Sequence, residues 1–177
     1  MKPVDCKIQW HKHLVFDNFL ELEHYKQVCR AHVPESPGTH GVTAYGNIDD
    51  RLQLANIAEY YHDRLIGFLH QLAPEKVKEY TWTNLAINLV GPHHEFDIHT
   101  DHENKLLSVV VYLLPETSTG TFCYSDCQGN NAQEVPWKPN RAFIFSRTDS
   151  SWHNYLGDGN HIRRVLIMSL ITDKHGW

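Results

Sequence analysis

Residues 96–116, FDIHTDHENKLLSVVVYLLPE, place a histidine, one spacer and an aspartate immediately before a long apolar run. Imidazole nitrogen and carboxylate oxygen together are ligands for divalent transition metals. Scattering 14 histidines and 21 carboxylates independently over 177 positions predicts about 1.7 His-x-Asp or His-x-Glu coincidences. The sequence contains two, His93 with Glu95 and His99 with Asp101. Spacing alone therefore identifies neither pair as a site.

The sequence around each pair favours His99 and Asp101. In residues 95–101, EFDIHTD, polar and apolar positions alternate, which places His99 and Asp101 on the same face of one strand or its end. His153, in SSWHNYL at another predicted strand, offers a third ligand. Two imidazoles and one carboxylate on a barrel wall form the facial arrangement typical of non-haem iron(II), with positions left open for substrates. We predict a metal site at these three residues.

The rival pair has a different setting. His93 and Glu95 follow Gly91 and Pro92 in a predicted loop, with no long strand directly after them. Nearby polar residues of the same loop region are expected to be solvated, or to contact substrate at the mouth of a pocket.

A short strand within residues 7–20 and then two helices are predicted to precede a series of strands. Residues 20–32 form the first helix, with Asp17 or Asn18 as its cap, and residues 49–74 form the second, at helical apolar spacing. After residue 80 about eight short apolar or alternating runs follow with no helix between them. The predicted runs are 80–90, 95–101, 106–114, 120–126, 134–138, 141–146, 151–156 and 163–171.

This order of elements predicts an α+β fold in one compact domain of 177 residues. The expected core is a double-stranded β-helix, or jelly roll, over residues 80–172. The N-terminal helices, within residues 1–79, are expected to flank and support this core.

The motifs HTD, WH and IRR, in this order, resemble those of the iron(II)- and 2-oxoglutarate-dependent dioxygenase superfamily. The surrounding order is similar too: VFDNFL opens the domain, NLVG precedes the first ligand, and KPNRAFIFS precedes the distal histidine. The resemblance covers residues 14–172 loosely and residues 84–170 well. It implies that iron(II) binds His99, Asp101 and His153.

The resemblance also implies an arginine that pairs with the distal carboxylate of 2-oxoglutarate, and two adjacent arginines compete for this role. We favour Arg163 over Arg164, because Val165 two positions on is smaller than Leu166 and leaves more room for a carboxylate. Many members of the superfamily have Ser or Thr at that position, which this chain lacks. Asn88 resembles an asparagine that some members place near the co-substrate.

A chain of this kind is expected to be a hydroxylase that uses iron(II), 2-oxoglutarate and dioxygen and releases succinate and carbon dioxide. An amino-acid residue in a peptide, a free amino acid or a small metabolite could each be the substrate. One alternative is a jelly-roll isomerase or hydrolase that holds zinc or manganese at the same residues. A second alternative is a catalytically silent ligand-binding module of the same fold.

Composition excludes other classes of function. The formal net charge of -5 and the pI near 6.2 argue against a broad phosphate-binding face and hence against nucleic acid as a partner. The N-terminal residues have no apolar signal region, and the apolar runs are too short to span a bilayer. We expect a soluble, cytoplasmic protein, and its oligomeric state stays open.

Overall fold

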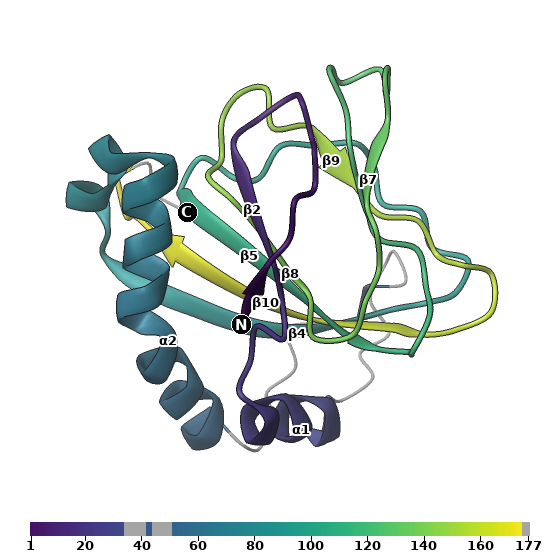
Figure 1. Cartoon of the computed structure of the whole chain (residues 1–177), viewed down its shortest axis with the longest axis horizontal. Helices are drawn as coiled ribbons and strands as arrows, with labels where there is room; N and C mark the ends of the chain where they lie inside the picture. Colours follow the sequence, from purple (N-terminus) through teal and green to yellow (C-terminus); the bar gives the residue numbers. More distant parts are fainter. Residues whose placement is uncertain (34–41, 44–50, 175–177) are drawn as a thin grey trace.

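The structure is a computed structural model that describes residues 1–33, 42–43 and 51–174. Two α-helices and one short 3-10 helix lie on one side of a large sheet (Figure 1). They are α1 (Leu22–Arg30), α2 (Arg51–Leu72) and η1 (Pro74–Glu79). No helix in these described ranges is long and apolar enough to cross a membrane.

The predicted cap of the first helix is wrong. Asp17 lies in a strand, and Asn18 adopts a left-handed backbone conformation with φ of 51°. Glu21 occupies the N-cap position and makes no side-chain capping bond. Asp17 instead pairs with Lys138 and Arg141, each at 2.7 Å, so an ion-pair network takes the carboxylate that the sequence suggested for a cap.

The strands form two antiparallel sheets in a mixed α/β structure. The larger sheet has seven strands in the order β1-β2-β8-β5-β10-β4-β3, and the smaller has the order β7-β6-β9. The larger sheet comprises β1 (Lys2–Pro3), β2 (His13–Asp17), β3 (Val42–Thr43), β4 (Trp82–Val90), β5 (Lys105–Leu114), β8 (Ala142–Phe145) and β10 (Arg163–Ile171). The smaller sheet comprises β6 (Thr121–Cys123), β7 (Gln133–Val135) and β9 (His153–Asn154).

Three of these strands come from residues 1–79, where helical support and one short strand within residues 7–20 were expected; β2 confirms that strand. β1, β2 and β3 precede residue 79, and all three join the larger sheet. β2 pairs with β8, and β3 pairs with β4 at its Val90 end. Short strands of two residues carry too little sequence pattern to be recognised, which explains why β1 and β3 were missed.

The outer face of the larger sheet packs against the helices. Alternate residues of β5 and β10, such as Leu107, Val109, Leu166 and Met168, are buried there in one cluster with apolar residues of α1 and α2. Because successive side chains in a strand point to opposite faces, the residues between them face the other way. The inner face of the same strands therefore points away from the helices.

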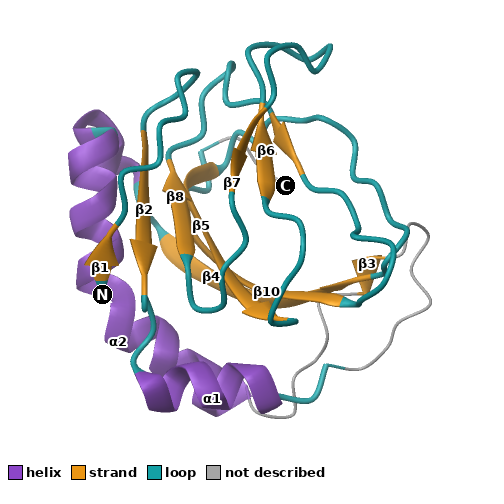
Figure 2. Cartoon of the chain, turned by 45° about the vertical axis from the view of Figure 1, so that its right-hand side comes forward, coloured by secondary structure: helices purple, strands orange, loops and turns teal. Residues whose placement is uncertain are grey.

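The smaller sheet lies opposite this inner face (Figure 2). Cys123 and Val135 of the smaller sheet pack with Tyr112, Phe143 and Val165 of the larger one in a second apolar cluster. This cluster fills only part of the space between the sheets. Beside it lies a pocket bordered by the inner face of β4, β5 and β10.

The strand predicted over residues 95–101 is wrong as a regular element. This segment makes only two isolated bridges, Glu95 with Leu156 and His99 with His153. His99 and Asp101 line the pocket, and so does Phe96, although its parity in the segment is opposite. The backbone follows its neighbour too briefly to form a ladder, so strict alternation does not hold here. The C-terminal run 163–171 was predicted with the bounds that β10 has.

Candidate metal centre and adjoining pocket

The structure brings together the three predicted ligands. His99, Asp101 and His153 each offer one ligand atom, and these atoms all lie within 4.8 Å of one another. No other group of three such residues within reach of one ion was found among the described residues. The backbone of His99 donates to His153 at 3.1 Å and accepts from it at 2.9 Å. This isolated bridge places the two imidazoles next to each other, with ring centroids 4.4 Å apart.

Backbone carbonyls orient both imidazoles. Nδ1 of His99 lies 2.8 Å from the carbonyl of Asp97, and Nδ1 of His153 lies 2.9 Å from the carbonyl of Ser151. A carbonyl can only accept, so each Nδ1 carries the proton and each Nε2 keeps a lone pair. In this arrangement the backbone carbonyl fixes the tautomer and the ring orientation, and Nε2 is the nitrogen that can bind a metal.

Asp101 is held ionised although it is only 8% exposed. Burial alone would raise its pKa, but the ammonium of Lys105 at 2.7 Å from Oδ1 and a hydrogen bond from Ser108 to Oδ2 lower the pKa to about 2. A ligand carboxylate must be deprotonated to bind a metal. Lys105 and Ser108 therefore prepare this side chain.

His153 is held neutral. Burial lowers its pKa to about 4, against the opposing influence of Asp101. Its ring packs edge-on against Phe145 with 4.9 Å between centroids, which explains the low water access. Metal binding needs neutral imidazole and ionised carboxylate, so His153 and Asp101 are both in their metal-binding forms at neutral pH. With Nε2 of His99 they offer two nitrogens and one carboxylate oxygen. This donor set fits a divalent transition metal.

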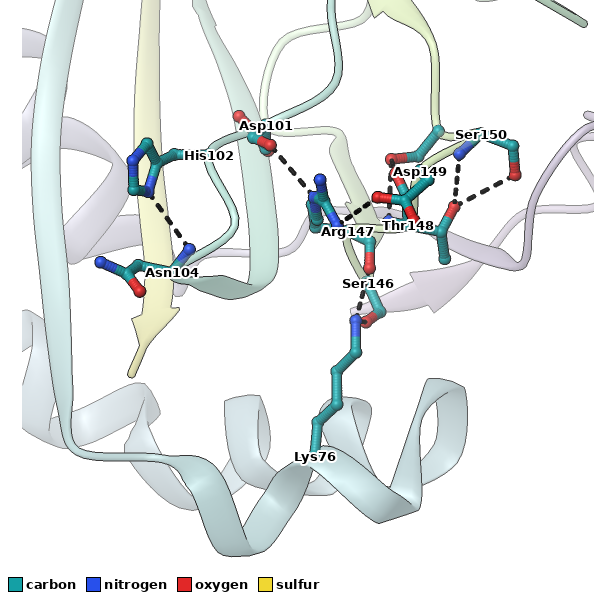
Figure 3. Close-up of polar contacts among 10 residues, drawn as sticks. Lys76, Asp101, His102, Asn104, Ser146, Arg147, Thr148, Asp149 and Ser150 are labelled. Carbon is teal, nitrogen blue, oxygen red and sulfur yellow. Dashed lines mark hydrogen bonds and ion pairs between the residues drawn. The ribbon is translucent and has the colours of Figure 1, made fainter. Parts of the chain in front are cut away.

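A second polar network supports the backbone of Asp101 (Figure 3). Arg147 donates from Nε to the carbonyl of Asp101 at 3.2 Å and from Nη1 to Asp149 at 2.7 Å. Lys76, from η1, reaches Oγ of Ser146 at 3.0 Å and also donates to the carbonyl of Arg147. These contacts connect the metal-ligand loop to the loop that precedes His153.

The register of the strands arranges the pocket in rows across the larger sheet. Asn88 on β4 lies opposite Val165 on β10, and the next inward row along is Ala86 with Ile167. Rows on one face are two residues, or about 6.6 to 6.8 Å, apart. The pocket therefore runs along β10, from Arg163 at one end past the three ligands.

Arg163 is a buried cation with free donors. Its side chain is 2% exposed, and neither Nε nor Nη1 has a hydrogen-bond partner, while Nη2 makes one long contact of 3.5 Å with Thr121. The guanidinium carbon lies 4.6 to 5.5 Å from three ring centroids, those of Tyr112, Trp137 and Tyr155. Aromatic ring faces attract a cation, but they do not supply the hydrogen-bond acceptors that the guanidinium N–H groups need. Arg163 is thus prepared for an anion.

The neighbouring arginine serves the opposite face. Arg164 donates from Nη1 to the carbonyl of Cys29 at 2.8 Å and from Nη2 to that of Ala31, at the C-terminal end of α1. It does not line the pocket. Asn88 does line it, and its Oδ1 is buried without a partner.

The rival pair does not approach the site. His93 and Glu95 are both exposed and belong to no metal-sized group among the described residues. His94, which lies between them in the sequence, has a packing role, because it contacts the rings of Phe96 and Tyr155.

Several residues that shape the site were not identified from the sequence. Tyr112, Trp137 and Thr121 surround Arg163, and Lys105 with Ser108 holds Asp101. Ser108 and Tyr112 share the inward parity of β5, which the alternation rule could have shown once the pocket face was known. Trp137 comes from a loop, and no local pattern marks it.

Fold and site together define a class: two antiparallel sheets with a two-histidine, one-carboxylate centre in the pocket between them. No family model matches the sequence, and no curated protein matches it. Solved structures do match. A prolyl-4-hydroxylase from Pseudomonas putida has a TM-score of 0.62 and 15% identity, with 92% of this chain and 93% of that chain covered.

Two further solved structures share the fold. A prolyl hydroxylase from Trichoplax adhaerens, in complex with a hypoxia inducible factor peptide fragment, has a TM-score of 0.63 and 14% identity over 92% of this chain and 84% of its own. A 2OG-Fe(II) oxygenase family protein from Burkholderia pseudomallei has a TM-score of 0.62 and 13% identity over 90% and 84%. The fold of this chain is the fold of these oxygenases.

Proposed function

We propose that this chain is a single-domain, jelly-roll dioxygenase that uses iron(II) and 2-oxoglutarate. The observation that carries the proposal is the pairing of two features in one pocket. One is the triad of His99, Asp101 and His153, and the other is the buried guanidinium of Arg163 with two unpaired donors. A keto diacid is complementary to both, since one end can bind a metal while the other accepts from the guanidinium.

The triad would hold iron(II) through Nε2 of each histidine and one oxygen of Asp101. Bound there with 2-oxoglutarate, iron(II) supplies the activation of dioxygen that no side chain can provide. The protein's own part is to keep His153 neutral and Asp101 ionised, and to orient both imidazoles through backbone carbonyls.

Arg163 would bind the distal carboxylate of 2-oxoglutarate, with Asn88 and Thr121 as additional polar contacts. The aromatic rings around the guanidinium restrict its rotation, so its free donors are held in place before the ligand binds. Arg164 is a structural residue in this proposal because the carbonyls of Cys29 and Ala31 occupy its Nη1 and Nη2 and because it does not line the pocket.

The overall reaction converts a substrate C–H group, dioxygen and 2-oxoglutarate to a C–OH group, succinate and carbon dioxide. One oxygen atom enters succinate and the other enters the product, while the keto acid loses its C1 carboxylate and supplies two electrons. Peptide prolyl residues, free amino acids and small metabolites are the candidate substrates, and the solved complex with a peptide shows that the shared fold can take a peptide.

The alternative of a zinc or manganese hydrolase or isomerase is less well supported. Such chemistry gives no reason for a buried, unpaired arginine inside the pocket. A silent binding module would keep that arginine, but it would not require two oriented imidazoles and an ionised carboxylate within 4.8 Å.

The test is an anaerobic titration of the protein with iron(II) and then 2-oxoglutarate. We expect the weak visible metal-to-ligand absorption that arises when a keto acid binds iron directly. His99→Ala should abolish the band, and His93→Ala is a matched control that should leave it unchanged. Bound metal without the band in the unmodified protein would refute the proposal and favour the zinc or manganese reading.

A further inference from the structure

The pocket has a second polar area, in the row of the larger sheet that contains Ser108, the donor to Oδ2 of Asp101. Asn84 on β4, Ser169 on β10 and Ser108 on β5 are cross-strand neighbours in one row of the larger sheet. All three line the pocket. The row between them and Asn88 is apolar and contains Ala86 and Ile167. The inner face of the sheet thus has two separate polar areas.

The hydroxyl of Ser169 is an unexplained buried polar group. The residue is 1% exposed, and its Oγ has no hydrogen-bond partner. Packing against apolar side chains would favour alanine at this position, since a buried hydroxyl without a partner is destabilising. A ligand atom that hydrogen-bonds to Ser169 would remove this cost.

Lys105 supplies a positive charge near this area. Its ammonium lies 2.7 Å from Oδ1 of Asp101, its side chain is 25% exposed, and it lines the pocket. An ammonium has three donors, and Asp101 uses one of them. The remaining donors are available to a second acceptor in the pocket.

The charges of the loaded site leave this area positive. The distal carboxylate of 2-oxoglutarate neutralises Arg163, whereas iron(II), Asp101, the second carboxylate of 2-oxoglutarate and Lys105 sum to one positive charge. Arg147, the other cation beside Asp101, already has Asp149 as its partner at 2.7 Å. An acidic group on the substrate would neutralise this remaining positive charge.

We infer that Lys105, Ser169 and Asn84 form an anion subsite that binds a carboxylate of the substrate. The inference rests on the proposed function and specifies its substrate class, a small acid or an acidic residue. Because Lys105 touches a metal ligand, the oxidised carbon lies only a few bonds from the carboxylate. Lys105 and Ser169 act here on specificity and position, and the metal site performs the oxidation.

The experiment uses the anaerobic protein with iron(II) and saturating 2-oxoglutarate, and it reads the visible absorption band. Acetate and propionate are the probes, and acetamide and propionamide are their neutral counterparts of the same shape. We expect the acids to shift the band saturably and the amides to leave it unchanged. Equal effects of an acid and its amide, or no effect of either acid, would overturn the inference.

Variants then locate the binding. Lys105→Gln removes the charge that helps to keep Asp101 ionised, so iron(II) is added until the band reaches its full height, and acid binding should then be weaker by about 10- to 100-fold, the range of one charge-assisted hydrogen bond. Ser169→Ala should weaken it by a smaller factor. Lys26→Gln, which replaces a surface lysine paired with Glu23 at 2.8 Å, is the matched control and should bind like the unmodified protein.

The two proposals fail in different ways. A missing band in the unmodified protein contradicts the proposed dioxygenase and, with it, the subsite. A normal band with acid binding that is unchanged in Lys105→Gln contradicts the subsite alone, because the acid then binds the metal or Arg163. Calorimetric titration of propionate gives the same comparison without turnover.

Discussion

Replacing Arg163 by methionine should have opposite effects on stability and on co-substrate binding. Methionine is unbranched and can fill most of the volume that the arginine stem occupies among Tyr112, Trp137 and Tyr155. The unliganded protein then no longer buries a cation with two unpaired donors. Lost cation–π attraction, about 0.5 to 2 kcal/mol per ring, offsets part of this gain.

The net effect on the unliganded chain should be a free energy of unfolding that stays equal or rises by about 1 to 4 kcal/mol, as when buried charges are replaced by apolar groups. In a chain of 177 residues, each kcal/mol corresponds to about 2 to 4 °C in the unfolding midpoint. Binding of 2-oxoglutarate should weaken by two charge-assisted hydrogen bonds, about 3 to 6 kcal/mol, or roughly 100- to 10,000-fold.

The assay is thermal unfolding under anaerobic conditions with iron(II), with and without 2-oxoglutarate. A ligand at about 100 times its dissociation constant adds about 2.7 kcal/mol, which would raise the midpoint by about 5 to 11 °C. Arg163→Met should abolish this rise. Arg164→Met is the control: it loses its bonds to the carbonyls of Cys29 and Ala31, so its stability should fall while the rise remains. A full rise in Arg163→Met, or its loss in Arg164→Met alone, would refute the assignment.

Three further predictions concern other parts of the chain. Ser108→Ala removes the donor to Oδ2 of Asp101 and should weaken iron binding about 10- to 100-fold in a competition titration; unchanged affinity would contradict the role of Ser108. Leu107→Ala, on the outer face, should lower the free energy of unfolding by about 2 to 5 kcal/mol in urea and leave iron affinity unchanged. Burial alone would raise the pKa of Asp17, but hydrogen bonds from Arg141 and Lys138 lower this pKa below its ordinary value. The ionised carboxylate therefore stabilises the fold above the ordinary pKa, and this stabilisation is lost as the pH falls through the lowered pKa. Asp17→Asn should therefore cost about 1 to 3 kcal/mol at pH 7 and less at pH 3, and an equal cost at both values would argue against the ion pairs.

The sequence predicted the order of most elements and the three candidate ligands that the structure brings together, because both depend on local alternation and on motif order. β10 was predicted with the right bounds, and its alternation separates Arg163 from Arg164 by face. The failures have a common cause. The cap of α1 and the strand at residues 95–101 depend on partners distant in the chain, Arg141 in one case and His153 in the other.

The anion subsite could not be predicted for the same reason. Ser169 and Asn84 lie far apart in the sequence, and only the register of β10 with β4 makes them neighbours. Lys105 follows Asp101 by four residues. In a helix this spacing would predict an ion pair, but outside a helix it predicts nothing about contact. Their proximity is a property of the folded sheet.

The division of β4 between two environments gives the protein a simple route to new specificity. Its inward residues Asn84, Ala86 and Asn88 line the pocket, whereas Ile87 and its outward neighbours pack with the helices. Substitutions at every second position can thus remodel ligand selection while the intervening positions preserve folding. A library of variants at the inward residues of this strand would change ligand selection while leaving the packing of the strand against the helices intact.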